Sequence, residues 1–466
     1  MLFNSIQYIV LLSATLLAYW LSPWLRLRQA VVLLASGYFY FSWSPAFGVM
    51  LFGLIVVNWI IGGLIERTHC RRWLFVACLL NLALLAYFKY MNFFLENIHA
   101  LMNVEDEGLH GSALSIILPL GISFYVFELI SYQVDVCQKK IKHERDFSVF
   151  AIFVLFFPHL IAGPICRAGQ FMPQIHVMQK RDSVRFYNGL YMFVAGLALK
   201  AGLADGLANF VNVIFKAPAN YSGLDNFLAV LGFGIQILCD FWGYSLMALG
   251  AALLFGYVLP FNFNQPYAAF SIRDFWRRWH ITLSNWLRDY LYIALGGARV
   301  SAKWKIQRNL LLTMLIGGLW HGASWNFILW GGIHGVSLTV NRWFDTAPLP
   351  GVVKNTLRWP PFAWLMTMLV VFIAWVFFRA VTFTDAITIL EKIVTPLPGW
   401  SSTKLEPLYF ELLILFLPIQ WIVHKTTYNF NMAGMDMWKA AVTFTAISIF
   451  TLVYYVDGND FIYFQF

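Results

Sequence analysis

The chain has 466 residues, of which 60% are hydrophobic and 18% aromatic, and only 12% carry a charge. A soluble protein of this size has about a quarter charged residues, so the composition excludes an ordinary soluble protein. The formal net charge is +9. The basic residues lie in short loops, as the positive-inside bias predicts, and no nucleic-acid partner is expected. The five cysteines form no C-x-x-C pair, so they predict neither a metal site nor a disulfide framework.

Apolar segments long enough to cross a bilayer, which takes about 20 residues, recur along the chain. We expect an all-α polytopic membrane protein with about ten to twelve spanning or half-spanning segments, folded as one integral-membrane domain over residues 1–466. The N-terminus has no cleavage site, so we expect an uncleaved first helix. The clearest segments are Ile6–Leu21, Phe47–Ile65, Trp73–Phe88, Leu228–Leu254, Phe362–Phe378 and Ala440–Val456.

The charges of the first loops predict an orientation. The loops after Leu21, at Glu66–Arg72 and at Cys137–Asp146 are basic, whereas Asn103–Ser112 is acidic. This alternation predicts an outside N-terminus and cytoplasmic basic loops. It indicates a multi-pass membrane protein.

Two regions do not have the pattern of full spans. Phe153–Arg167 is short and is broken by Pro158 and Pro164, which predicts a re-entrant segment. Asn262–Arg308 is rich in Trp and Arg and too polar to span. We expect short interfacial helices and re-entrant pieces there, on the cytoplasmic side.

The stretch "GGLWHGASWNFILWGGIHG", Gly317–Gly335, places two histidines in one of the most apolar parts of the chain. Its glycines spaced i,i+4 predict close packing of helices. An ionisable group at membrane depth indicates function, and His321 is the stronger candidate. On one unbroken helix His334 would be rotated by about 220° from His321 and would face away from it.

A second constellation is "SIRDFWRRWHITLSNWLRDYLYIALGG", in which arginines alternate with aromatic residues. Two interpretations stay open: an interfacial helix that meets lipid phosphates, and a docking surface for an anionic donor, because guanidinium forks suit phosphates. His280 within it is a candidate second catalytic group or an interfacial histidine. The candidate donor or substrate contacts are Arg277, Arg278, Trp276, Trp320, Trp325 and Asp289.

The C-terminus, "DGNDFIYFQF", is unusually aromatic for a chain end. It predicts either an interfacial anchor or a tail that enters the protein and presents the hydroxyl of Tyr463. Most of the polar residues that lie in apolar runs are expected to be paired charges inside the bundle, and none has metal-ligand spacing. These residues are Lys89, Glu128, Asp135, His159, Lys200, Asp240 and Arg379.

Six segments together resemble the membrane-bound O-acyltransferase family, in its bacterial alginate O-acetyltransferase-like branch that acetylates polysaccharides. Where that branch usually reads Asp-Phe-Ser-Gly-Tyr-Ser-Asp, this chain reads "DFWGYSL", with Trp242 and Leu246 as the departures. The six segments are "LPLGISFYVFELISY", "FFPHLIAGPICR", "FNQPY", "DFWRRWHITLSNWLRDYLYIALGG", "RNLLLTMLIGGLWHGASWNFILWGGIHG" and "FIYFQF".

The resemblance implies a bundle of about eleven transmembrane helices with re-entrant and interfacial helices around a tunnel through the bilayer. It implies a motif core over residues 262–341 and an aromatic tail over 457–466. His321 matches the family's catalytic histidine, and His280 matches an earlier motif position. The tail resembles that of a small partner in teichoic-acid D-alanylation, whose tyrosine is proposed to carry the acyl group, and this residue is Tyr463 here.

The implied activity is O-acetylation of an exported polysaccharide, either alginate-like or a cellulose exopolysaccharide. The implied donor substrate is acetyl-CoA or another acyl thioester, without a bound cofactor or metal. The implied partners are a periplasmic SGNH or esterase-like acetyltransferase, other polysaccharide export proteins and membrane lipids. His321 is then a general base, since neutral imidazole accepts a hydroxyl proton near pH 7. The alternatives are peptidoglycan O-acetylation, acylation of a lipid or protein, a proton-coupled transporter or channel, and a structural scaffold.

Overall fold

The computed structural model describes residues 2–102, 116–161, 163–300, 302–348, 350–395, 415–416, 418, 437–456 and 462. These residues form helices and connecting loops, without a β-strand among them. Tyr463 and most of the expected aromatic tail lie outside the described residues. The expected all-α class is confirmed for the described chain.

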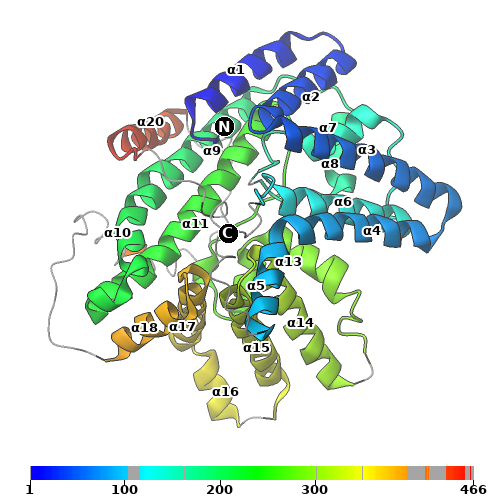
Figure 1. Cartoon of the computed structure of the whole chain (residues 1–466). Coiled ribbons are helices and arrows are strands. Elements are labelled where there is room, and N and C mark those ends of the chain that lie inside the picture. The colour runs from blue at the N-terminus through cyan, green and yellow to red at the C-terminus, as the bar shows by residue number, and fades with distance from the viewer. Residues whose placement is uncertain are drawn as a thin grey trace. The chain divides into compact units, whose positions relative to one another are not determined.

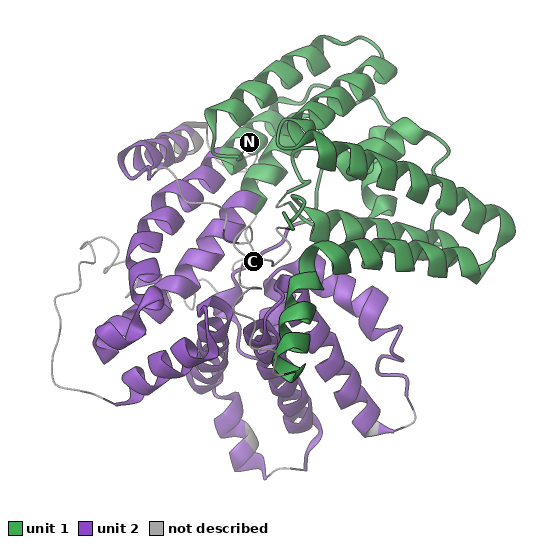
Figure 2. Cartoon of the chain, in the orientation of Figure 1, with its two compact units in different colours: residues 1–193, 245–260 green, residues 194–244, 261–466 purple. Residues whose placement is uncertain are grey.

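Figure 1 labels the helices of the chain, which divides into two compact units that interleave in sequence (Figure 2). Unit 1 comprises residues 1–193 and 245–260, and unit 2 comprises residues 194–244 and 261–466. Two long helices, α9 and α11, contribute residues to both units.

Unit 1 contains the N-terminal helices and the beginning of α9. Gly189 in α9 and Gly250 in α11 lie against each other's backbone, so a side chain at either position would overlap the opposite carbonyl. The helices of this unit are α1 (Ile6–Leu21), α2 (Leu25–Phe41), α3 (Pro45–Thr68), α4 (Arg71–Leu85), the π-helix η1 (Ala86–Tyr90), α5 (Met91–Met102), α6 (Ile122–Cys137), α7 (Phe147–Leu155), α8 (Ala168–Ile175) and α9 (Ser183–Leu197).

The segment between α7 and α8 is irregular and buried, which confirms the expected break there. Its residues form turns, and nearly all of the described ones are buried. The N–H of Cys166 donates to Oε1 of Glu128 on α6 at 2.9 Å. Nε2 of His159 donates to the carbonyl of Phe153 at 3.2 Å. These two bonds provide the internal partners that irregular backbone at membrane depth requires.

Unit 2 carries all the motifs that the sequence singled out for chemistry, apart from the segment between α7 and α8 and the stretch on α6. Its helices after α9 are η3 (a π-helix, Ala198–Ala204), α10 (Asp205–Lys216), η4 (Pro218–Asn220), α11 (Gly223–Leu254), η5 (Pro266–Ala268), α12 (Ile272–Arg278), α13 (Ile281–Trp286), η6 (a π-helix, Leu287–Tyr292), α14 (Lys303–His321), α15 (Trp325–Thr346), α16 (Gly351–Arg358), α17 (Pro360–Arg379), α18 (Phe383–Val394) and α20 (Met437–Val453).

Each of the six clear apolar segments coincides with a helix, so these predictions are confirmed. The region after Asn262 consists of short helices, as expected for interfacial pieces. By length and composition, five helical stretches among the described residues could cross a membrane. They are Pro45–Thr68, Arg71–Met102, Ser183–Lys216, Gly223–Leu254 and Pro360–Arg379.

Glycines bring α14 and α15 together as a close antiparallel pair. A Cβ added at Gly318 would overlap the carbonyl oxygen of Phe327, and one at Gly331 would overlap that of Met314. Each obstacle is backbone and cannot move aside like a flexible side chain. The predicted role of the glycines in helix packing is therefore confirmed.

Candidate active site

The helix that carries His321 ends at that residue. Gly322 adopts an extended conformation (φ −167°, ψ 154°), and the Ser324 side chain then caps α15 by accepting the N–H of Asn326 at 3.1 Å. Serine at an N-cap satisfies one of the N–H groups that a helix start leaves unpaired. The chain reverses here, so His321 and His334 lie on two different helices. The prediction that His334 faces away from His321 assumed one unbroken helix and therefore does not apply.

His321 lies in an aromatic cage inside unit 2. Its ring centroid is 5.0 Å from that of Trp320, 4.9 Å from that of Trp330 and 5.3 Å from that of Phe378. The last two contacts are edge-on or T-shaped, and only 3% of His321 is exposed. Such an environment holds the imidazole in one orientation and keeps water away from it.

His334 lies on the same tryptophan, from one turn further along α15. Its ring centroid is 4.9 Å from that of Trp330, and it is fully buried. Nε1 of Trp276 donates a hydrogen bond to Nδ1 of His334 at 3.3 Å. An indole N–H only donates, so Nδ1 carries the lone pair and Nε2 carries the proton of the neutral ring. The two histidines thus flank one indole.

His280 is the third histidine of this group. It sits between α12 and α13 with φ 41° and ψ 56°, a left-handed conformation that costs a non-glycine residue about 1–3 kcal/mol. Its ring packs edge-on against Phe241 at 4.7 Å and against Trp320 at 6.1 Å. We call these three histidines, with Trp276, Trp320 and Trp330, the histidine–tryptophan cluster.

Several polar atoms of the cluster have no hydrogen-bond partner among the described residues. They are both ring nitrogens of His280, Nε2 of His334 and Nε1 of Trp330. Buried polar groups in native proteins are nearly always paired, so a group of unpaired ones requires an explanation. Together they provide N–H donors and imidazole lone pairs for a polar reactant in an apolar surrounding.

His280 lies between α12 and α13, which have seven and six residues and are too short to cross a bilayer. Burial lowers the pKa of His280 to about 3. Desolvation disfavours the charged imidazolium, so His280 is neutral at physiological pH.

The predicted donor contacts are divided between buried and exposed positions. Trp276 and Trp320 belong to the histidine–tryptophan cluster. Arg278 is held by Asp274, with 3.0 Å between Nε and Oδ1, whereas Arg277 is exposed and makes no ion pair with the described residues. Both arginines follow Trp276 on α12.

The other two predicted contacts do not reach the cluster's interior. Trp325 is the first residue of α15, and 64% of it is exposed. Asp289 lies on η6 and accepts a hydrogen bond from Nε of Arg288 at 2.7 Å. The structure therefore brings His280, His321, Trp276 and Trp320 together, but not Trp325.

Unit 2 also contains a buried cluster of charged side chains on η3, α10 and α11. Nζ of Lys200 is 2.7 Å from Oδ1 of Asp205 and 2.8 Å from Oδ1 of Asp240, and all three side chains are at most 4% exposed. Lys200 and Asp205 are five residues apart, which the π-helix η3 places on one face. A side chain at Gly243 would overlap the carbonyl of Gly196, so this glycine allows the close approach. The expectation that Lys200 and Asp240 are paired charges inside the bundle is confirmed, and their partners include each other.

This charge cluster also contacts Ile462, the one described residue of the expected aromatic tail. The backbone N–H of Ile462 donates to Oδ2 of Asp240 at 2.7 Å, and only 2% of Ile462 is exposed. The next residue after Asp240 is Phe241, whose ring contacts His280. Two consecutive residues of α11 thus contact Ile462 and a candidate catalytic histidine.

Sequence reasoning missed the side chains that join the histidines, chiefly Trp330, Phe378 and Phe241. They have no polar motif, and an aromatic residue in an apolar run is usually ordinary core. Trp330 precedes a Gly-Gly pair by one residue, and its i,i+4 spacing to His334 was the available signal.

The sequence of this chain is similar to those of known membrane acyltransferases. Residues 79–380 match the model of MBOAT, the membrane-bound O-acyltransferase family. The chain is 42% identical to a protein of Azotobacter vinelandii named "Probable alginate O-acetylase", over 82% of this chain and 75% of that one. It is 34% identical to the peptidoglycan O-acetyltransferase of Helicobacter pylori, over 93% of this chain and 91% of that one. It is 27% identical to the teichoic acid D-alanyltransferase of Bacillus subtilis, over 48% of this chain and 59% of that one.

Proposed function

The chain belongs to the membrane-bound O-acyltransferase family and is a multi-pass membrane acyltransferase, and we propose that it delivers acetyl groups across the bacterial inner membrane to an exported polysaccharide. The acetyl group comes from a cytoplasmic thioester, acetyl-CoA. About eleven transmembrane helices around a tunnel would carry it across. A periplasmic esterase-like acetyltransferase would receive it and act with the polysaccharide export proteins.

The observation that carries this proposal is the hydrogen bond between Ile462 and Asp240. It holds the residue before Tyr463 inside unit 2, next in sequence to the Phe241 that packs on His280. A hydroxyl at the end of that segment is a suitable first acceptor, because it belongs to the same chain as the base and needs no diffusion step.

The first step is then a transfer to the tail. His321 takes the phenolic proton of Tyr463 as the oxygen attacks the thioester carbonyl. The carbon–sulfur bond breaks, the leaving thiolate takes the proton from His321, and an acetyl ester of Tyr463 remains. General-base catalysis of this kind contributes about 10²–10⁴-fold to the rate. A phenyl ester is still activated, so it can pass the acetyl group to the periplasmic partner in a second transfer.

The other cluster residues have positioning roles in this scheme. The N–H groups of Trp330 and His334 can donate to the carbonyl oxygen as negative charge develops on it. His280, neutral in its buried pocket, offers a second lone pair. Arg277 and Arg278 contact the phosphates of acetyl-CoA, since guanidinium groups bind phosphates in a bidentate way.

The polymer has two candidates. An alginate-like or cellulose exopolysaccharide follows from the probable alginate O-acetylase of A. vinelandii, which is 42% identical to this chain. Peptidoglycan is favoured by a different observation, because the H. pylori peptidoglycan O-acetyltransferase aligns over nearly all of both chains.

The test is acetyl content of the exported polysaccharide and of peptidoglycan in cells that lack the gene, complemented with wild type, His321→Ala or Tyr463→Phe. Tyr454→Phe, a tyrosine at the end of α20, is the matched control. The proposal expects both site variants to abolish acetylation of one polymer, with the protein still present in the membrane. Mass spectrometry of the C-terminal peptide should then show an acetyl group on Tyr463 in wild type. Normal acetylation by His321→Ala would exclude this mechanism and favour a transporter or scaffold. Loss in His321→Ala alone would place the acceptor hydroxyl on a partner.

A further inference from the structure

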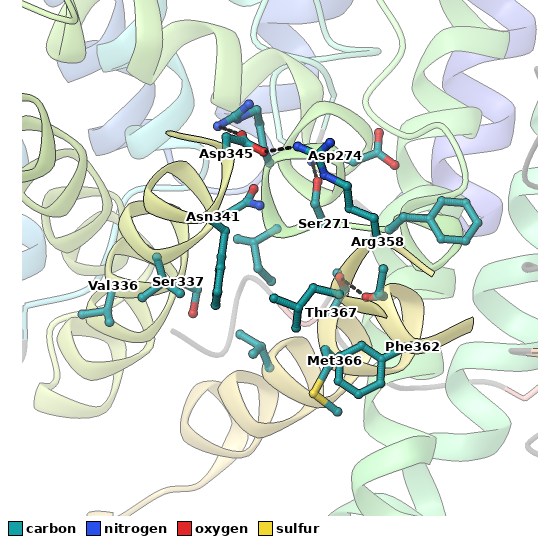
Figure 3. Close-up of a pocket in the computed structure, with 18 of the residues that line it drawn as sticks. Ser271, Asp274, Val336, Ser337, Asn341, Asp345, Arg358, Phe362, Met366 and Thr367 are labelled. Atoms are coloured by element: carbon teal, nitrogen blue, oxygen red, sulfur yellow. Dashed lines mark hydrogen bonds and ion pairs between the residues drawn. The ribbon is translucent and has the colours of Figure 1, made fainter. Parts of the chain in front are cut away.

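Unit 2 contains a cavity that shares one residue, Arg277, with the proposed acyl-transfer scheme. Its volume is about 650 Å³, within the range of about 300–1,000 Å³ that is usual for binding sites of small molecules. Helices α12, α15, α16 and α17 supply its walls. Figure 3 shows it from the side, with Asp345 at the upper end and Met366 at the lower end.

The cavity and the histidine–tryptophan cluster are built from different residues of the same two helices, α12 and α15. On α12, Arg273 and Asp274 line the cavity, whereas Trp276 bonds to His334. On α15, Val336 and Val340 line the cavity, and residues 330 and 334 form the cluster. None of the cluster's six residues lines the cavity, so we treat it as a separate binding site.

The polar end of the cavity has more positive than negative charge. The carboxylate of Asp345 forms ion pairs with two guanidinium groups. Its Oδ2 is 2.9 Å from Nη2 of Arg273, and its Oδ1 is 3.8 Å from Nη2 of Arg358. The other lining carboxylate, Asp274, already pairs with Arg278. An anionic group placed between Arg273 and Arg358 would therefore meet cations that share a single counter-charge.

The rest of the wall is apolar and partly open. Val336, Val340 and Met366 line it with exposed fractions of 53%, 43% and 38%. From Asp345 to Val336 along α15 is nine residues, or about 13 Å at the helical rise. The cavity thus combines an end lined by arginines with an apolar trough of roughly that length, beside α17, a helix apolar enough to cross a membrane.

We propose that this cavity binds one anionic membrane phospholipid, with its phosphate at Arg273 and Arg358 and an acyl chain along α15 and α17. The charge of the polar end selects a phosphate headgroup without a neutralising ammonium, and the exposed apolar wall selects a hydrocarbon chain. The basic residues of α12 and α16 place this end on the cytoplasmic side, where the positive-inside rule and anionic headgroups coincide. A soluble phosphate compound would satisfy the arginines but leave the trough facing water.

The test uses the full-length protein in nanodiscs of equal parts phosphatidylglycerol and phosphatidylcholine with identical acyl chains. Native mass spectrometry counts the lipids that stay bound after release. Wild type should retain phosphatidylglycerol in preference, and Arg358→Gln should lower the ratio of the two lipids by about fivefold, the effect of one basic residue near an anionic headgroup. Arg26→Gln, an exposed arginine that pairs with Asp146 outside the cavity, is the matched control and should keep the wild-type ratio.

A second variant, Val340→Trp, fills the trough without changing charge and should remove the retained lipid. Three results would overturn the proposal: equal retention of both lipids by wild type, an unchanged ratio in Arg358→Gln, or full retention of phosphatidylglycerol by Val340→Trp. Displacement of the lipid by added acetyl-CoA would also overturn it and assign the arginines to the donor. None of these results depends on whether Tyr463 carries the acetyl group.

Discussion

The backbone N–H of Ile462 lies 2.7 Å from Oδ2 of Asp240, a residue 222 positions earlier in the chain. Asp240 is fixed by Lys200, and its neighbour Phe241 contacts His280. One buried carboxylate thus connects a lysine, the C-terminal segment and the position next to a candidate catalytic ring.

We expect Asp240→Leu to release the tail, because it removes the acceptor for the Ile462 N–H. A hydrogen bond to a charged group contributes about 1.5–3 kcal/mol, so the docked fraction of the tail should fall by about tenfold or more. Trimming of the C-terminus by carboxypeptidase in detergent measures this fraction.

Asp240→Asn is the control for that experiment, since its amide oxygen still accepts the N–H. It should keep the tail protected, and any loss of activity it shows then reports the missing charge rather than an undocked tail. Equal trimming of wild type and Asp240→Leu would show that the bond does not hold the tail.

Close packing of α14 on α15 should depend on Gly331 and not on its neighbour. A methyl group at Gly331 would overlap the carbonyl of Met314, whereas one at Gly332 would lie 3.6 Å from Leu315, an ordinary contact. We expect Gly331→Ala to lower the free energy of unfolding by about 1–3 kcal/mol, as overpacking does. Gly332→Ala should leave it unchanged or raise it slightly. Thermal unfolding of the purified variants followed by circular dichroism compares the two, and equal midpoints would contradict the close approach.

Trp276 should act on catalysis through His334. Trp276→Phe keeps an aromatic ring but removes the donor that fixes the His334 tautomer. A neutral hydrogen bond contributes about 0.5–1.5 kcal/mol, so the transfer rate should fall by no more than about tenfold. His321→Ala should cost about 10²–10⁴-fold.

The measurement for Trp276 is the initial rate of label transfer from acetyl-CoA, with Trp304→Phe, an exposed tryptophan, as the control. A loss in Trp276→Phe as large as that in His321→Ala would show that Trp276 contacts the reacting atoms. If the rate is unchanged, the His334 tautomer does not matter.

The sequence predicted the helices well because apolar length is a local property. Ile6–Leu21 and Phe362–Phe378 are visible from composition alone, and so are the breaks at Pro158 and Pro164. It also predicted that the glycines pack helices and that Lys200 and Asp240 are charges with partners inside the bundle, without naming those partners.

The features that the sequence did not predict are contacts created by the way the chain folds back on itself and by local changes in helix geometry. The 13-residue spacing of His321 and His334 predicts opposite faces on one helix, yet the turn at Gly322 places both on Trp330. Asp205 joins Lys200 only because a π-helix changes the local periodicity. The contact between Ile462 and Asp240 has no local signal at all.

The buried state of His280 predicts a pH dependence of stability. Its pKa in the folded protein is lowered by burial to about 3, from an ordinary value of 6.5. Below pH 6.5 the unfolded chain binds a proton at this ring that the folded chain does not, so folding is disfavoured as pH falls from 6.5 toward 3. Each pH unit in that window costs about 1.4 kcal/mol. His280→Gln, which cannot titrate, should therefore lose less stability than wild type between pH 7 and pH 5. The comparison is the difference in thermal midpoint at the two pH values, for wild type and variant in the same detergent. Equal differences in the two proteins would mean that water or a bound group reaches His280 and lets it take up the proton when folded.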